Sequence, residues 1–117
     1  PTKSELITLD LAWKAVKHAK SNAIVVAHNK KIISISGGQT SRVDAVKYAL
    51  TKVRVPSGAV LASDAFFPFR DSVDLMKKHK IKSIIQPGGS IKDGEVIDAC
   101  NEYKISMVFT GTRVFKH

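Results

Sequence analysis

Short apolar runs alternate with longer amphipathic segments along this chain, and this alternation restricts its fold more than any other feature. Runs rich in β-forming residues predict strands at residues 23–27, 32–35, 60–63, 83–86 and 105–109. Helical spacing predicts helices over residues 4–20, from Ser41 to the turn at 56–58, from Asp71 to about Lys80, and from Ser90 to about Tyr103. This order predicts an α/β fold: a three-layer α/β/α sandwich with a mixed sheet of about five strands, the first two forming an antiparallel hairpin.

Helical stripes and capping patterns predict which side chains are buried and where two helices begin. Trp13 is the expected core anchor of the first helix. The expected buried stripe is Val43, Val46, Leu50 and Val53 in the second helix, and Val96, Ile97, Cys100 and Tyr103 in the last. Ser41 and Ser90 each stand three residues before an aspartate, the pattern of a capping box.

Length and composition predict one small domain over residues 1–117. No apolar run approaches the ~20 residues of a membrane span, and the first residues lack the apolar stretch of a signal peptide. We therefore expect a soluble, cytoplasmic protein without a membrane partner. Cys100 is the single cysteine, so it has no internal disulfide partner, and its place in a helical stripe predicts a core position.

The chain is basic, with 19 Lys and Arg against 10 Asp and Glu and a formal net charge of +9. Such an excess favours anionic partners. Its aromatic side chains gather in one short loop instead of interleaving with basic residues, which disfavours a nucleic-acid partner. A phosphorylated or carboxylated small molecule fits the charge equally well.

The loop Asp64-Ala-Phe-Phe-Pro-Phe-Arg-Asp71 follows a predicted strand and precedes a predicted helix, the position where α/β sheets bind ligands. Its phenylalanines suggest a flat apolar wall, with Asp64, Arg70 and Asp71 placing charge at the edges. Such a wall suits a planar heterocycle that carries polar groups.

The turn Gln86-Pro-Gly-Gly-Ser90 occupies the equivalent position after the next predicted strand. Its glycines allow backbone to approach a ligand closely. Ser90 is expected to open a helix whose N–H groups and positive dipole end attract an anion.

Several strings together resemble one family, that of the bifunctional AICAR transformylase/IMP cyclohydrolase of purine biosynthesis. They are Lys20-Ser-Asn-Ala23, Gly37-Gly-Gln-Thr-Ser-Arg-Val-Asp44, Ser63-Asp-Ala-Phe-Phe-Pro-Phe-Arg-Asp71, Gln86-Pro-Gly-Gly-Ser90 and Phe109-Thr-Gly-Thr-Arg113. The resemblance covers essentially the whole chain in order and is to the C-terminal part of the enzyme. It implies the second lobe of a transformylase unit built from two lobes of cytidine-deaminase-like fold.

The activity that the resemblance implies is formyl transfer from the co-substrate 10-formyltetrahydrofolate to the 5-amino group of AICAR. The cyclohydrolase domain and the first lobe, which carries the family's Lys-His pair, are not matched by this chain. The implied partners are AICAR, a reduced folate, and either a second copy in a homodimer or a first lobe. No metal is expected, because the His-x-Glu and Pro-Cys-x-x-Cys constellation of zinc deaminases does not occur.

The resemblance also assigns site residues. Asn22 corresponds to the catalytic side chain that orients the carboxamide or the formyl oxygen. The AICAR-binding positions are Asn22, Arg42, Phe66 and Arg113, and the folate-binding positions are Val43, Asp71, Ser90 and Ile91. His117 is a further candidate for reaching the nucleotide, whereas Lys17-His18 does not match the catalytic motif.

Structural interpretations of the same residues remain open from sequence alone. Asn22 is compatible with a turn former, Arg42 with an exposed first-turn residue, and Asp71 and Ser90 with N-caps. The alternative function is a nucleotide- or folate-binding module without chemistry of its own, or a partner subunit of a split enzyme. A nucleic-acid-binding protein rests on charge alone.

Overall fold

The computed structural model describes residues 2–67, 70–89, 91 and 93–111. Within them helices and strands follow in the order α1 (Lys3–Val16), β1 (Ile24–His28), β2 (Lys31–Ser36), α2 (Arg42–Thr51), β3 (Val60–Ser63), α3 (Asp71–Lys78), β4 (Ser83–Gln86), α4 (Asp93–Tyr103) and β5 (Ser106–Phe109). The five strands form one sheet in the order β2-β1-β3-β4-β5. β1 is antiparallel to both of its neighbours, whereas β3, β4 and β5 are parallel.

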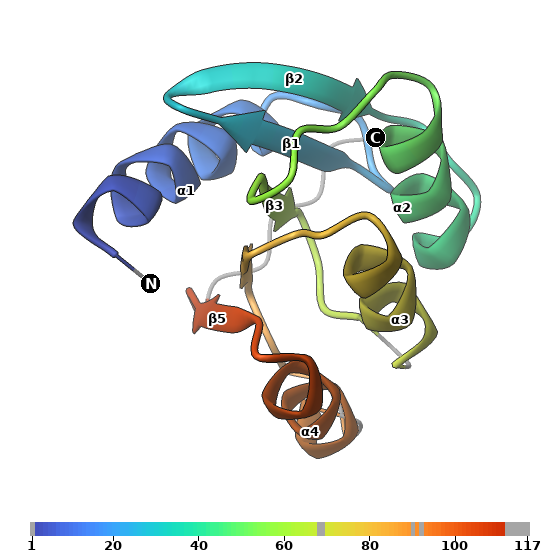
Figure 1. Ribbon diagram of the computed structural model, residues 1–117. Helices are drawn as coiled ribbons and strands as arrows, with labels where there is room; N and C mark the ends of the chain where they lie inside the picture. Colours follow the sequence, from blue (N-terminus) through green and yellow to red (C-terminus); the bar gives the residue numbers. More distant parts are fainter. Residues whose placement is uncertain (1, 68–69, 90, 92, 112–117) are drawn as a thin grey trace.

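The helices cover both faces of this sheet (Figure 1). α1 lies on one face, where Leu9, Trp13 and Val16 pack against apolar side chains of β1 and β3. α2, α3 and α4 lie on the other face and enclose the larger core cluster. The predicted three-layer sandwich with a mixed sheet is confirmed, and so is the core position of Trp13.

A capping box starts α1 one residue earlier than the apolar pattern predicts. The backbone N–H of Glu5 donates to Thr2 Oγ1 at 3.1 Å, and the Glu5 carboxylate accepts from the backbone N–H of Thr2 at 3.2 Å. The helix ends at Val16, so the predicted extension to residue 20 is wrong. Residues 17–20 instead lead the chain toward β1.

The predicted hairpin is confirmed between β1 and β2, with Ala27 opposite Ile32 and His28 opposite Lys31. Asn29 and Lys30 form its tip with φ values of 48° and 62°. Two successive positive φ values are typical of the tight turns that match the twist of paired strands.

Ser41 caps α2 as predicted, its Oγ accepting the backbone N–H of Asp44 at 3.1 Å. The helix ends at Thr51, which explains why the predicted burial of Val53 is wrong: its side chain is 40% exposed. Ala45 and Ala49 complete the buried stripe in its place. Small side chains there allow α2 to approach the sheet closely.

α4 begins at Asp93, later than the predicted start at Ser90, which lies outside the described residues. Its buried side is formed by Val96, Ala99 and Cys100. The predicted burial of Ile97 is wrong, since its side chain is 37% exposed, while the core position of Cys100 is confirmed.

Shortly after the ends of α3 and α4 the chain passes through a lysine in the left-handed conformation, with φ values of 60° at Lys80 and 58° at Lys104. The next residue donates its N–H back into the helix, from Ile81 to Met76 O at 3.0 Å and from Ile105 to Cys100 O at 2.9 Å. This is the Schellman arrangement, and the two isoleucines bury their side chains beside it. Each helix is thereby turned directly into the following strand.

Candidate functional site

The strand register brings the predicted site segments to one end of the sheet. Ile24, at the start of β1, lies opposite Ser36 at the end of β2 and Ser63 at the end of β3. β4 and β5 run parallel to β3, so Gln86 and Phe109 also end there. The sequence left open whether these segments share one edge, and the structure places the described ones on the same edge.

Arg42, the first residue of α2, forms the centre of a buried network at this end. Its Nη1 donates to Asp64 Oδ1 at 2.7 Å and to the carbonyl of Ala23 at 3.1 Å. Its Nη2 donates to Asn22 Oδ1 at 2.7 Å. Two residues predicted to bind the nucleotide, Asn22 and Arg42, are therefore in direct contact.

Asp64 joins three segments of the chain. Besides Arg42, its carboxylate accepts the Ser21 hydroxyl at 2.6 Å and the backbone N–H of Ala23 at 3.1 Å. The side chains of Arg42 and Asp64 are only 6% and 1% exposed. The predicted place of Asp64 at the edge of an exposed wall is therefore wrong, as is the exposed first-turn interpretation of Arg42.

Burial lowers the pKa of the Arg42 guanidinium, and the charge of Asp64 opposes that effect. Because an arginine pKa starts far above neutrality, the group stays charged. The ion pair therefore presents a fixed cation beside Asn22.

Asn22 is held on its other side by the segment that leaves β2. Its Nδ2 donates to the backbone carbonyl of Gln39 at 3.0 Å, and its backbone N–H donates to the same oxygen at 3.2 Å. The side chain is half-buried. It is therefore both oriented by the protein and accessible to a small molecule.

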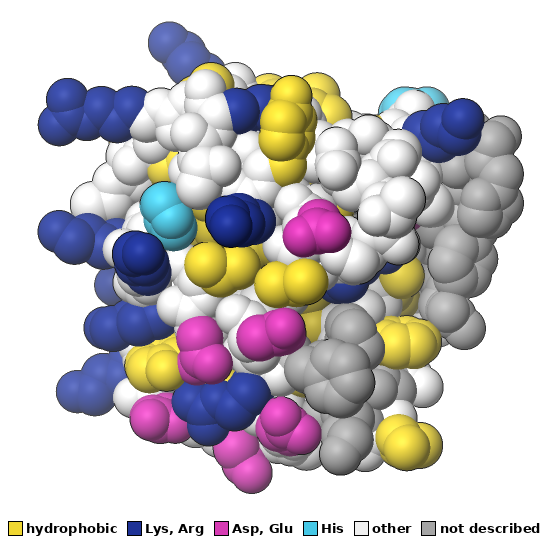
Figure 2. All heavy atoms as spheres, turned by 90° about the vertical axis from the view of Figure 1, so that its right-hand side faces the viewer, with side chains coloured by type: hydrophobic (Ala, Val, Ile, Leu, Met, Phe, Trp, Pro, Cys, Tyr) yellow, Lys and Arg dark blue, Asp and Glu magenta, His cyan; other side chains and the backbone are white. Residues whose placement is uncertain are grey.

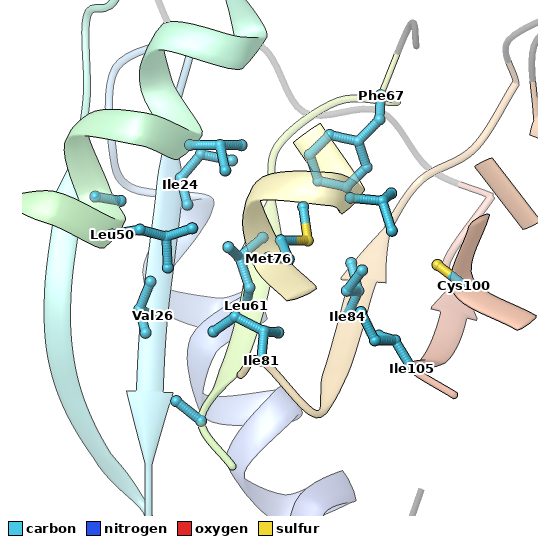
Figure 3. Close-up of a cluster of buried hydrophobic side chains, with 14 of the residues drawn as sticks. Ile24, Val26, Leu50, Leu61, Phe67, Met76, Ile81, Ile84, Cys100 and Ile105 are labelled. Atoms are coloured by element: carbon cyan, nitrogen blue, oxygen red, sulfur yellow. The ribbon is translucent and has the colours of Figure 1, made fainter. Parts of the chain in front are cut away.

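The aromatic loop is not the flat exposed wall that its composition predicts. Phe67 is fully buried and points into the larger core beside Met76 (Figure 3). Phe66 is half-buried, and Phe69 lies outside the described residues. The wall prediction is wrong for Phe67, because its ring belongs to the buried cluster that also holds apolar side chains of α3, β3 and β4.

Arg70 anchors the end of the same loop to two helices. Its Nη2 lies 2.8 Å from Glu102 Oε2 and 3.2 Å from Asp74 Oδ1, and Tyr103 donates its hydroxyl to Asp74 at 2.6 Å. The carboxylates raise the pKa of Arg70, and the Tyr103 hydrogen bond lowers that of Asp74. On the face of the molecule that Figure 2 shows, most acidic side chains gather in the lower half, and Lys and Arg side chains line the left margin.

The remaining predicted site residues are not joined to this network by the contacts described above. Val43 is partly buried beside Arg42, and Ile91 is 99% exposed after the glycine turn. Asp71 is exposed at the start of α3, where its Oδ1 accepts the N–H of Ser72 at 2.9 Å. Ser90, Arg113 and His117 lie outside the described residues.

Sequence reasoning missed Ser21 and Gln39, and it misplaced Asp64. The available signal was weak, consisting of an aspartate directly after a buried strand and an arginine after a helix cap. No cluster of three His, Cys, Asp or Glu that could hold a metal occurs in the described part of the chain. None of the helices described there is long and apolar enough for a membrane crossing.

A family model for the AICARFT/IMPCHase bienzyme matches residues 1–52. The bifunctional purine biosynthesis protein PurH of Aquifex aeolicus is 56% identical over 121 residues, covering 100% of this chain and 24% of that protein. The protein of the same name from Clostridium perfringens is 58% identical over 117 residues, covering 100% of this chain and 23% of that protein. The chain belongs to this bienzyme family. It spans about a quarter of the length of these relatives.

Two solved structures resemble the fold of this bienzyme-family chain. The dCMP deaminase of cyanophage S-TIM5 matches with a TM-score of 0.59 at 11% identity, over 92% of this chain and 97% of that one. A diaminohydroxyphosphoribosylaminopyrimidine deaminase/reductase of Thermotoga maritima matches with a TM-score of 0.54 at 19% identity, over 91% of this chain and 36% of that one. The predicted cytidine-deaminase-like fold is confirmed.

Proposed function

We propose that this chain is the C-terminal lobe of an AICAR transformylase unit and contributes to formyl transfer from 10-formyltetrahydrofolate to AICAR in purine biosynthesis. The observation that carries the proposal is the 2.7 Å hydrogen bond between Arg42 and Asn22. The family resemblance assigns both residues to AICAR, and they are 20 positions apart in sequence.

The free hydrogen-bonding groups of this pair suit the substrate. With the described residues, Arg42 uses both N–H groups of Nη1 and one of Nη2, which leaves one Nη2–H and the Nε–H for an acceptor on the nucleotide. Asn22 retains one Nδ2–H beside them. Both residues thus offer donors to a carboxamide or formyl oxygen.

The other assignments extend the proposal to both substrates. Phe66 supplies a stacking face for the imidazole, and Arg113 supplies a forked cation for the nucleotide's oxyanion. Val43, Asp71, Ser90 and Ile91 form the folate side, with the Asp71 carboxylate accepting N–H groups of the pterin. These roles rest on the family resemblance, and no metal is part of the scheme.

The reaction also needs a base for the weakly nucleophilic amine, and the resemblance assigns it to the first lobe. We therefore propose that a first lobe, in the same chain or in a homodimer, completes the site. Because Phe67 is fully buried, the aromatic loop does not present that ring to such a partner.

The test is a chimera in which this chain replaces the matching 117-residue segment of the Clostridium perfringens protein. The expected result is formyl transfer within about tenfold of the parent rate. Arg42→Met should lower kcat/KM for AICAR at least about tenfold, because one charge-assisted hydrogen bond contributes ~1.5–3 kcal/mol. Arg54→Met, which removes an exposed arginine, is the matched control and should retain the chimera's activity.

The same chimera separates the alternative function, a binding module without chemistry. A folded chimera that binds AICAR and folate by calorimetry, but shows no turnover beside an active parent, would favour that alternative. A folded chimera without binding or turnover would contradict both.

A further inference from the structure

Asp64 is a buried side chain to which the family assignments give no role. It follows β3 directly and is 1% exposed. Its two oxygens accept hydrogen bonds from Arg42, Ser21 and the backbone of Ala23. One carboxylate thus ties the start of α2 to the segment that carries Asn22.

The two hydrogen-bond partners of the Asn22 side chain fix which of its amide atoms is the oxygen and which is the nitrogen. A guanidinium only donates, so the atom 2.7 Å from Arg42 Nη2 must be the amide oxygen. A backbone carbonyl only accepts, so the atom 3.0 Å from Gln39 O must be the amide nitrogen. Two independent partners therefore require the same orientation, with the second N–H left for a ligand.

We propose that Asp64 is a positioning residue for formyl transfer: by holding Arg42 it fixes the Asn22 amide, so that Asn22 presents an N–H to the reacting formyl oxygen. This inference rests on the proposed function. It gives Asp64 a role through Arg42, without contact to either substrate.

The chemical step explains why a donor is needed there. The 5-amino nitrogen of AICAR bonds to the formyl carbon while the bond from that carbon to N10 of the folate breaks. The amine loses one proton and N10 gains one. As the nitrogen adds, negative charge develops on the formyl oxygen, and a fixed N–H stabilises that charge, whereas a carbonyl oxygen would repel it.

Asp64→Asn tests this role because it keeps the shape of the side chain and removes its charge. The buried Arg42 then loses its anion, so its hold on Asn22 weakens. The first readout is NMR of the 117-residue chain. We expect resolved Nη–H signals of Arg42 in the parent, and loss of those signals with at least about tenfold faster exchange of the Asn22 amide protons in Asp64→Asn.

Asp10→Asn is the matched control, because it removes the carboxylate of an exposed ion pair with Lys14 on α1. It should leave both signals unchanged. If Asp64→Asn does not fold, Ser21→Ala decides the question, since it removes one hydrogen bond to Asp64 and leaves the ion pair. Ser21→Ala should accelerate exchange of the Asn22 side-chain amide protons about threefold. If Asp64→Asn folds, or if Ser21→Ala has to replace it, unchanged Arg42 and Asn22 signals in that folded variant would overturn the inference.

The second readout is kinetic and uses the Clostridium perfringens chimera. Asp64→Asn should lower kcat by about 10–100-fold, which is less than the ~10²–10³-fold for complete loss of one oxyanion donor, because Asn22 itself remains. In an Asn22→Ala background the same change should lower kcat by less than about threefold, because the group through which Asp64 acts is already absent.

Additive losses in this cycle would show that Asp64 acts independently of Asn22, and would overturn the inference. An inactive parent chimera would count against the proposed function instead. In that case the NMR result still decides whether Asp64 orients Asn22.

Discussion

At the scale of single residues, one ion pair decides what Arg42 does. Its partner Asp64 stands 22 positions away in sequence and lies 2.7 Å away in space. Removing one member of such a buried pair typically costs ~3–5 kcal/mol, because an uncompensated charge is left behind. The capping motif before Arg42 predicts the helix start correctly, but no local pattern contains the aspartate that draws the side chain inward.

Cys100 illustrates burial acting on reactivity. It lies beside an open hollow of about 450 Å³ between α4 and β5, yet only 2% of the residue is exposed, and burial raises its pKa to about 11. At pH 8 about one thiol in a thousand is then ionised, and the thiolate is the nucleophile. We predict that a disulfide reagent labels the native chain far more slowly than the urea-unfolded chain.

Labelling is followed by the absorbance of the group that the disulfide reagent releases. Since Cys100 is the only cysteine in the sequence, this absorbance reports on Cys100 alone, and Cys100→Ala supplies the blank. Equal labelling rates in native and unfolded protein would mean that α4 does not bury the thiol.

At the scale of elements, α1 is fastened to the sheet by a charged hydrogen bond. Ser83 in β4 donates its hydroxyl to Glu5 Oε2 at 2.6 Å, and this contact is the main cause of the lowered pKa of Glu5. A pKa lower in the folded than in the unfolded state stabilises the fold fully above the unfolded value of ~4.3. That contribution is lost as pH falls through the folded pKa.

Glu5→Gln should therefore reduce the free energy of unfolding by about 1 kcal/mol at pH 7, a typical value for one hydrogen bond. The difference should shrink as the pH falls below the unfolded pKa of ~4.3 toward the lower folded pKa of Glu5, because the parent carboxylate then takes up its proton. Urea unfolding between pH 7 and pH 3.5 measures it, with Asp10→Asn on the same helix as control. A cost that stays constant over this range would contradict the assignment.

The glycine turn provides a second test at this scale. A Cβ on Gly88 would lie 2.7 Å from Phe109 Cδ1, and its φ is 75°. Gly88→Ala should therefore cost about 1–3 kcal/mol through overlap and backbone strain. Gly94→Ala should instead stabilise the chain by about 0.5–1 kcal/mol, because Gly94 lies in α4 with nothing within 4 Å of the added carbon.

Thermal or urea unfolding of both variants measures the change in the free energy of unfolding, which should fall for Gly88→Ala and rise for Gly94→Ala. Equal effects would show that the turn does not pack against Phe109.

The elements that sequence predicts best are those whose signal is local. β3 and β4 are predicted to the residue, because each holds adjacent apolar residues in a short segment that turn residues bound. The ends of α1 and α2 are predicted too late, since alanines and valines continue the pattern after the backbone has left the helix. Phe67 is assigned to an exposed wall because several phenylalanines stand together beside a proline in one loop, whereas the apolar cluster that buries its ring is made by other elements.

At the scale of the whole molecule, sheet topology assembles the site. β1 enters the sheet antiparallel to β3, so that Ile24, at its start, faces Ser63, at the end of β3. Asn22 therefore precedes one strand, Asp64 follows another, and the two meet at the same edge. Had β1 run parallel to β3, Asn22 would lie at the opposite edge from Asp64. The hairpin before β3 is thus what makes the contact between Asn22 and Arg42 possible.

The last prediction concerns the chain by itself. We expect the 117-residue chain to fold and yet to transfer no measurable formyl group from 10-formyltetrahydrofolate to AICAR. The reason is chemical: the family resemblance assigns the base to a first lobe, and a positioned base typically contributes ~10²–10⁴ in rate. Chromatographic detection of formylated AICAR measures turnover, circular dichroism confirms folding, and the Clostridium perfringens chimera is the positive control. Turnover by the chain alone near the chimera's rate would mean that a base within these residues suffices, and the two-lobe scheme would have to be abandoned.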